Sequence, residues 1–169
     1  MKQVAQLLND MIACGVIRNY ALFGAMAQMR YTEAVATLDA DVLVAVPSVD
    51  RMDVLAGIYG YRKEQGFENE GDAVGMGAWP VQFMPAFTPL TREVMENAKI
   101  ADFDGVPLRV LRADYLAVIA LSVRRAKDYA RILALLESLS VTREQIEQLA
   151  AKHDLSQAWQ QFEARFSDE

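Results

Sequence analysis

Apolar residues recur at two spacings along this chain, and the order of those spacings predicts the fold. In some segments every third or fourth position is apolar, as in an amphipathic helix, whereas others are short apolar runs typical of strands. Helices are predicted at residues 2–14, 25–33, 48–59 and 88–98, and strands at 16–24, 35–47, 79–87 and 100–111. The last of these segments is expected to turn back at Asp104-Gly105, a pair that favours hairpins.

The last third of the chain keeps the helical spacing throughout. Helices are predicted there at residues 113–123, 126–139, 141–154 and 155–166. Thr142 and Gln145 stand three positions apart at the start of the third and fit a capping box. Residues 57–78 hold six glycines and predict turns, with a short hairpin around 61–69 and 73–77. We therefore expect an α+β fold, in which a small mixed sheet flanked by helices precedes a helical C-terminal third.

Composition narrows the class of protein. The chain has 169 residues, and we expect a single domain over 1–169, made of an α/β core at 1–111 and a helical part at 112–169. The net charge of −6 argues against a broad basic surface for nucleic acid but leaves room for a local basic patch. The single cysteine, Cys14, fits a reducing compartment and is expected to pack inside a helix. With neither a membrane-spanning run nor a signal peptide, the sequence indicates a cytoplasmic protein without a membrane partner.

Two aspartates stand one residue apart at the entry to an apolar run, TLDADVLVAVP at residues 37–47. On a strand, Asp39 and Asp41 would share one face. Two carboxylates held together repel each other unless a cation or a strong donor lies between them. Because Mg²⁺ is bound by one or two carboxylates together with substrate phosphates, the pair suits a magnesium site. The simpler alternative is a solvated strand start with two surface acids.

A glycine turn precedes this pair in the sequence. Gly24-Ala25 follows the strand-like segment that ends in LFG and opens a predicted helix. A glycine at that point allows backbone N–H groups to approach a phosphate, and helix N-termini favour anions. Only a short helix and a connection separate the turn from Asp39. The order of strand, glycine, helix and strand therefore predicts a phosphate site next to a metal pair.

In this order the segment IRNYALFGAMAQMRYTEAVATLDADVLVAVP resembles the core motif of the nucleotidyltransferase superfamily with the DNA-polymerase-β-like fold. More closely, it is similar to the minimal bacterial nucleotidyltransferases related to AbiEii-type toxins of toxin–antitoxin systems. The later segments PVQFMPAFTPLTREVMENA and GVPLRVLRADYLAVIALSVRRAKDYARILALL resemble the downstream strands and the Lys-Asp helix of those proteins.

The resemblance implies a role for each matching position. Asp39 and Asp41 match the Mg²⁺-binding pair at the catalytic centre, and Gly24 and Ala25 match the phosphate-binding turn. A lysine and an aspartate in the helical part, Lys127 and Asp128, match the residues that contact phosphate and orient that contact. The resemblance implies a nucleoside triphosphate as substrate and a hydroxyl on RNA, protein or a small molecule as acceptor. It also implies a toxin-like role with an antitoxin protein as partner.

Two departures from the family pattern leave a second function open. The turn reads Gly-Ala, so the side-chain hydroxyl of a Gly-Ser turn is missing. The family's third carboxylate belongs on the strand at 79–87, where the polar candidate is Gln82. A glutamine is neutral and cannot act as a general base. Either another carboxylate, from 70–72 or 102–104, replaces it, or the chain is a catalytically inactive module that senses nucleotides or binds protein. A purely structural domain is a third alternative.

A basic cluster stands out in this acidic chain. Arg124, Lys127 and Arg131 have the i, i+3, i+7 spacing of one helical face, and Arg125 lies beside them. They are either a solvated face paired with acids such as Asp128 or a contact for triphosphate or RNA.

Overall fold

The computed structural model describes residues 1–47, 55–66, 69–70, 73–76 and 79–166. The chain divides into two compact units. The first, here called the sheet unit, comprises residues 1–26 and 36–111, and the second, the helical unit, comprises residues 27–35 and 112–169. The predicted single domain over 1–169 stays a prediction, and each unit is described by itself.

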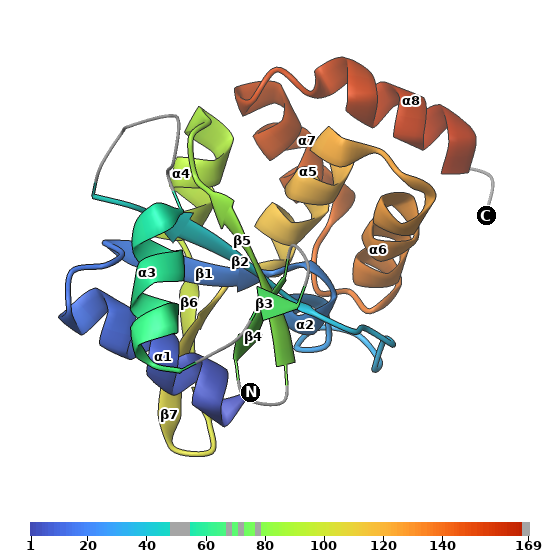
Figure 1. Cartoon of the computed structure of the whole chain (residues 1–169). Helices are drawn as coiled ribbons and strands as arrows, with labels where there is room; N and C mark the ends of the chain where they lie inside the picture. The colour runs from blue at the N-terminus through green and yellow to red at the C-terminus, as the bar shows by residue number, and fades with distance from the viewer. Residues whose placement is uncertain (48–54, 67–68, 71–72, 77–78, 167–169) are drawn as a thin grey trace. The chain divides into compact units, whose positions relative to one another are not determined.

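The sheet unit is built on a seven-stranded mixed sheet with the strand order β3-β4-β5-β2-β1-β7-β6 (Figure 1). The strands are β1 (Asn19–Phe23), β2 (Ala40–Ala45), β3 (Asn69–Glu70), β4 (Ala73–Met76), β5 (Trp79–Pro85), β6 (Lys99–Phe103) and β7 (Val106–Val110). The helices of this unit are α1 (Lys2–Ala13), α3 (Ala56–Glu64) and α4 (Pro89–Glu96). A five-residue helix, α2 (Gly24–Gln28), begins in the sheet unit and ends in the helical unit.

The centre of the sheet is buried because its strands are apolar on both faces. β2 pairs antiparallel with β1 and parallel with β5. Val42 and Val44 are completely buried on one face of β2, and Leu43 is 1% exposed on the other. Apolar side chains on both faces are typical of a central strand, because each face of the sheet is then removed from water. The pairing of β2 on both sides therefore fixes the backbone at Asp41 and at the entry to the strand, where Asp39 lies.

The helical unit consists of α5 (Ala113–Val123), α6 (Ala126–Glu137), α7 (Arg143–Lys152) and α8 (Ser156–Phe166), together with residues 27–35. Trp159 and Phe162 of α8 are buried and stack with their ring centroids 5.3 Å apart. The predicted capping box is confirmed: the Gln145 N–H donates to the Thr142 hydroxyl at 3.3 Å, and the Thr142 N–H donates to the Gln145 side chain at 2.9 Å. The predicted α+β class and the helical C-terminal third are confirmed as well.

Two local predictions were wrong, the first of them in part. The predicted hairpin is found between β3 and β4, which pair antiparallel, but it does not include residues 61–64. Those residues complete α3, because Ile58 and Arg62 are four positions apart and are buried together on one helical face. The helix predicted at 48–59 falls largely outside the described residues. Cys14 is exposed, since α1 ends at Ala13 and the thiol stands at the C-cap, away from the buried face.

No helix among the described residues is long and apolar enough to cross a membrane.

Candidate functional site

The two predicted metal ligands lie where the chain enters β2. Asp41 is the second residue of β2, and Asp39 is the residue immediately before the strand begins. Both side chains are half-buried. The Thr37 hydroxyl lies 3.0 Å from the backbone carbonyl oxygen of Asp39 and 3.3 Å from its Oδ1, and it can donate to either. The backbone at Asp41 is therefore fixed by the strand pairing of β2, and the backbone at Asp39 by the contact with Thr37.

Gly24 lies directly against the Asp41 carboxylate. It is the first residue of α2 and directly follows Phe23, the last residue of β1, which pairs with Asp41. Its φ of +66° is a left-handed conformation that side chains other than glycine adopt at a cost. A Cβ placed on Gly24 would meet Asp41 Oδ2 at 1.9 Å. The glycine therefore both permits the turn and leaves the room that the carboxylate occupies.

Gln82 is the neighbour of Asp41 on the adjacent strand. The register of β2 with β5 places Asp41 directly beside Gln82, so their side chains share one face of the sheet. Gln82 is exposed to solvent. The structure thus brings Gly24, Asp41 and Gln82 together at one point, and Asp39 adjoins them along the chain.

The substitute carboxylates considered for Gln82 do not lie beside it. Asp102 belongs to β6 and Asp104 to the turn that follows, at the edge of the sheet four strands away from β5. Asp102 is also engaged there, because its Oδ1 accepts a hydrogen bond from the Gly105 N–H at 3.1 Å. Glu70 is on β3, two strands from β5, and residues 71–72 lie outside the described residues. Over the described part of the chain, no group of three or more acidic, histidine or cysteine side chains is placed to hold a metal ion.

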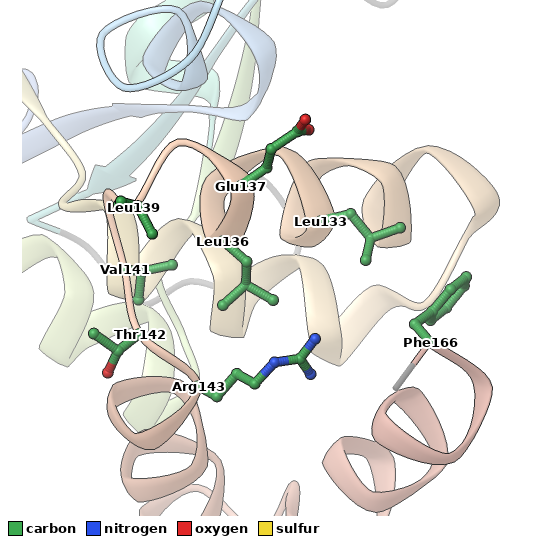
Figure 2. Close-up of a pocket in the computed structure, with 8 residues that line it drawn as sticks. All are labelled: Leu133, Leu136, Glu137, Leu139, Val141, Thr142, Arg143 and Phe166. Carbon is green, nitrogen blue, oxygen red and sulfur yellow. The ribbon is translucent and has the colours of Figure 1, made fainter. Parts of the chain in front are cut away.

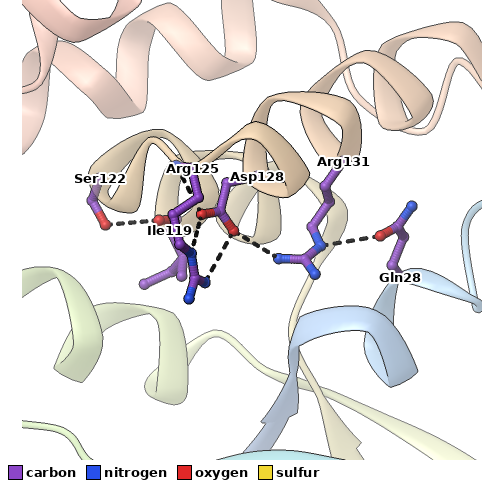
Figure 3. Close-up of polar contacts among 6 residues, drawn as sticks. All are labelled: Gln28, Ile119, Ser122, Arg125, Asp128 and Arg131. Atoms are coloured by element: carbon purple, nitrogen blue, oxygen red, sulfur yellow. Dashed lines mark hydrogen bonds and ion pairs between the residues drawn. The ribbon is translucent and has the colours of Figure 1, made fainter. Parts of the chain in front are cut away.

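The other two predicted site residues lie at the corner between α5 and α6 in the helical unit. Lys127 is exposed, whereas Asp128 is 1% exposed. Figure 3 shows the carboxylate of Asp128 between Arg125 and Arg131. Asp128 Oδ2 accepts hydrogen bonds from the backbone N–H of Arg125 at 3.1 Å and from its Nε at 2.8 Å. Arg131 Nη1 lies 3.4 Å from Asp128 Oδ1 on the next turn. Asp128 therefore caps α6 and holds two arginines, and its predicted effect on Lys127 stays a prediction.

The basic cluster does not form the continuous helical face that its spacing suggested. Arg124 ends α5 in a left-handed conformation with φ of +63°, so the chain turns between Arg124 and Lys127. Of the predicted alternatives, pairing with Asp128 is found for Arg125 and Arg131. Arg131 Nε also donates to Gln28 Oε1 at 3.0 Å. This contact joins residues 103 positions apart, so sequence spacing alone could not have revealed it.

Competing effects determine the pKa of Asp128. Burial alone would raise it, but hydrogen bonds from the side chain and backbone of Arg125, together with the charges of Arg125 and Arg131, outweigh burial and lower the pKa below its ordinary value. The carboxylate is thus ionised at neutral pH. The network of two arginines and one aspartate carries a net positive charge at the start of α6, where the Arg125 side chain reaches solvent.

A cavity of about 680 Å³ also lies in the helical unit (Figure 2). It is lined mainly by apolar side chains of α6 and the loop after it, with Phe166 at its end. Arg143 points into it from the start of α7 and is ion-paired with Glu163. None of the predicted site residues lines this cavity.

Comparison with known proteins relates the chain to nucleotidyltransferase-like structures. No protein-family model matches the sequence, and a search of curated proteins finds no match. Among solved structures, an antigenic nucleotidyltransferase-like protein from Paracoccidioides brasiliensis is similar, with a TM-score of 0.58 and 15% identity over 94% of this chain and 91% of that one. The antibiotic-resistance factor ANT(2'')-Ia, solved in solution, gives a TM-score of 0.50 and 15% identity over 98% and 99% of the two chains. At this identity the likeness shows the fold, which is nucleotidyltransferase-like.

The contact between Gly24 and Asp41 predicts a large effect of Gly24→Ala. The change is expected to lower the free energy of unfolding by more than the roughly 1–2 kcal/mol that a left-handed alanine costs, because the new methyl group also displaces the carboxylate. Urea unfolding followed by circular dichroism measures it.

Gly15→Ala is the matched control, because Gly15 has a φ of +71° and open space around its Cα. The combined change Gly24→Ala/Asp41→Ala is expected to recover part of the loss. Equal losses for the two single glycine variants would contradict the importance of the Asp41 contact.

The lowered pKa of Asp128 predicts a pH-dependent contribution to stability. Its contribution is fully present above the ordinary carboxyl pKa of about 4 and is lost as the pH falls through the lowered pKa. Asp128→Asn is expected to cost on the order of 3 kcal/mol at pH 7, because two arginines lose their buried partner. The difference from the wild-type protein should shrink as the pH falls below 4.

Unfolding titrations from pH 7 to pH 3 measure this difference. Asp154→Asn, at an exposed left-handed position where asparagine is well tolerated, serves as a control and should leave the pH profile unchanged. A difference that stays constant down to pH 3 would contradict an ionised Asp128 with a lowered pKa.

Proposed function

We propose that the chain binds a nucleoside triphosphate with Mg²⁺ and transfers its nucleotidyl group to a hydroxyl acceptor. The observation that carries the proposal is the placement of Asp41. Its half-buried carboxylate lies against Gly24 and beside Gln82, close to Asp39 in the chain, within a fold whose solved neighbour is nucleotidyltransferase-like.

The residues present fit a single magnesium ion. Two carboxylates at the entry to one strand offer the oxygen ligands that Mg²⁺ prefers, and phosphate and water oxygens complete its coordination in nucleotide sites. Asp39 and Asp41 would hold the ion, which supplies positive charge that offsets the charge of the triphosphate. Gly24 keeps the approach to Asp41 free of a side chain. A bulkier residue at position 24 would occupy the space that the carboxylate now fills.

The proposed reaction joins the acceptor oxygen to the α-phosphorus and releases pyrophosphate. The acceptor hydroxyl loses its proton in this step. By the resemblance, Gln82 takes the position of a third acid that would accept this proton. Because an amide cannot accept it, the proton passes to solvent water. We therefore expect slow transfer. Exposed Lys127 is the residue of the helical unit that we assign to contact with phosphate, on the basis of the resemblance.

The finer features of the proposal come from the resemblance to minimal bacterial nucleotidyltransferases of the AbiEii type. They are an RNA, protein or small-molecule acceptor, a role as the toxin of a toxin–antitoxin pair, an antitoxin as partner and a cytoplasmic location. The exposed single thiol of Cys14 agrees with a reducing compartment.

A second function is favoured by Gln82 itself. Asp41 has an amide as its direct neighbour, and the acids of residues 102–104 lie at the far edge of the sheet. A site with two carboxylates can still bind a nucleotide with its metal. In this alternative the chain is a catalytically inactive module that senses nucleotides or binds protein.

Calorimetric titration with ATP, GTP, CTP and UTP tests the proposed metal pair. We expect binding of at least one nucleotide with MgCl₂ and a loss of about tenfold or more in affinity with EDTA or in Asp39→Asn/Asp41→Asn. Asp104→Asn, in the exposed turn after β6, is the control and should bind as the wild type does. Binding that is unaffected by the double change would exclude Asp39 and Asp41 as ligands.

Gln82→Glu separates the two functions. If the fold retains a catalytic arrangement, a carboxylate at this exposed position should raise the rate of label transfer from a radioactive nucleotide to total RNA or lysate protein by about 10²-fold, the usual contribution of a general base. Unchanged nucleotide affinity shows that the new glutamate leaves binding intact. Binding without transfer in both proteins would favour the sensing module.

A further inference from the structure

Thr37 is a polar residue to which no sequence pattern assigned a role, and it lies beside a predicted metal ligand. It is half-buried in the segment that leads into β2, two positions before Asp39. Its Oγ1 lies 3.0 Å from the backbone carbonyl oxygen of Asp39 and 3.3 Å from Asp39 Oδ1. Because a hydroxyl has one proton to donate, Thr37 shares it between two acceptors of the same residue.

The two aspartates of the predicted metal pair differ in what fixes them. Asp41 belongs to β2 and is paired with Phe23 of β1 and with Gln82 of β5. Asp39 is the residue immediately before the strand and lies outside this paired register. Strand pairing therefore fixes Asp41, whereas the orientation of the Asp39 carboxylate depends on a side-chain contact. The Thr37 hydroxyl supplies that contact.

A hydroxyl is a suitable partner for a carboxylate that binds a cation. Carboxylates that bind metals are themselves hydrogen-bonded by outer groups, which fix their orientation. A hydroxyl does this without a positive charge, whereas a lysine or arginine at the same place would repel the cation. Thr37 reaches one oxygen of Asp39, and no described residue donates a hydrogen bond to the other, Oδ2. The protein can thus hold one oxygen while the second serves as a ligand.

We propose that Thr37 is a positioning residue of the metal site, whose hydroxyl holds the Asp39 carboxylate in the orientation that binds Mg²⁺. The inference rests on the proposed function, because it takes Asp39 as a metal ligand. Thr37 then does for Asp39 what strand pairing does for Asp41. In the simpler alternative, Thr37 bonds only to the backbone carbonyl of Asp39 and stabilises the entry to the strand.

The first test uses the full chain without metal. Three-bond couplings between Hα and Hβ of Asp39, measured by NMR, report whether its side chain keeps one χ1 rotamer. We expect one rotamer in the wild type and in Thr37→Ser, which keeps the hydroxyl. Thr37→Val has the same shape without the hydroxyl and should show averaged couplings. An unchanged single rotamer in Thr37→Val would contradict the positioning role and favour the simpler alternative.

The second test measures the affinity for Mg²⁺. The full chain is titrated with MgCl₂, alone and with the nucleotide that binds best in calorimetry, and the backbone amide shifts of Asp39 and Asp41 are followed. We expect Thr37→Val to bind Mg²⁺ about tenfold more weakly, the lower end of the range for outer-shell partners, and Thr37→Ser to bind as the wild type does.

Leu38→Ala is the matched control, because Leu38 lies in the same segment with 88% of its surface exposed. It should bind Mg²⁺ as the wild type does. Equal losses in Leu38→Ala and Thr37→Val would assign the effect to the segment and overturn the role of the hydroxyl. Cooperative urea unfolding of each variant shows that it is folded at the start of both tests.

The outcomes separate this inference from the proposed function. Mg²⁺ binding by the wild type that Thr37→Val leaves unchanged would overturn the inference and leave the metal pair in place. The absence of a saturable shift in both titrations of the wild type would overturn the metal pair, and the positioning role with it.

Discussion

The candidate site depends on the close approach of a backbone to a carboxylate. Gly24 lies where any Cβ would overlap Asp41, and its left-handed backbone turns the chain from β1 into α2. Asp41 in turn is fixed by its place in β2, whose two neighbouring strands are both paired with it. The glycine, the strand register and the buried valines thus act together. A change in any of them moves the same carboxylate.

A second constraint is the buried charge of Asp128. An ionised group with 1% exposure is stable only with hydrogen-bonded partners, and Arg125 and Arg131 supply them. Because these hydrogen bonds keep Asp128 buried, it differs in environment from Lys127, its exposed neighbour in the sequence. Lys127 faces solvent and is available for a ligand, whereas Asp128 is committed to the start of α6. The resemblance assigned both residues to one task, and that shared role stays a prediction.

Much of the fold followed from residues near one another in sequence. The capping box at Thr142, the hairpin at Asp104-Gly105 and the strand containing Gln82 each rest on a local pattern, so they were predicted. In the candidate site, the glycine turn and the aspartate pair are local sequence patterns, whereas the packing of Gly24 on Asp41 requires strand pairing. Residues 61–64 were predicted as part of a turn region because the surrounding segment is rich in glycine and charged residues. The burial of Arg62, which favours their place in α3, is not visible in that local pattern. The contact of Gln28 with Arg131 depends on tertiary folding, and no local signal carries it.

The helical unit is discontinuous in sequence, because residues 27–35 belong to it although the sheet strands follow them. During synthesis this segment leaves the ribosome long before α6 exists, and it must wait for partners about a hundred positions downstream. Such contacts carry a loop-closure cost and slow folding. A fragment that begins at Arg112 would also lack Gln28, the acceptor of Arg131. Helices α5 to α8 therefore do not form an independent unit by themselves. Transferring them to another protein would require the transfer of residues 27–35 as well.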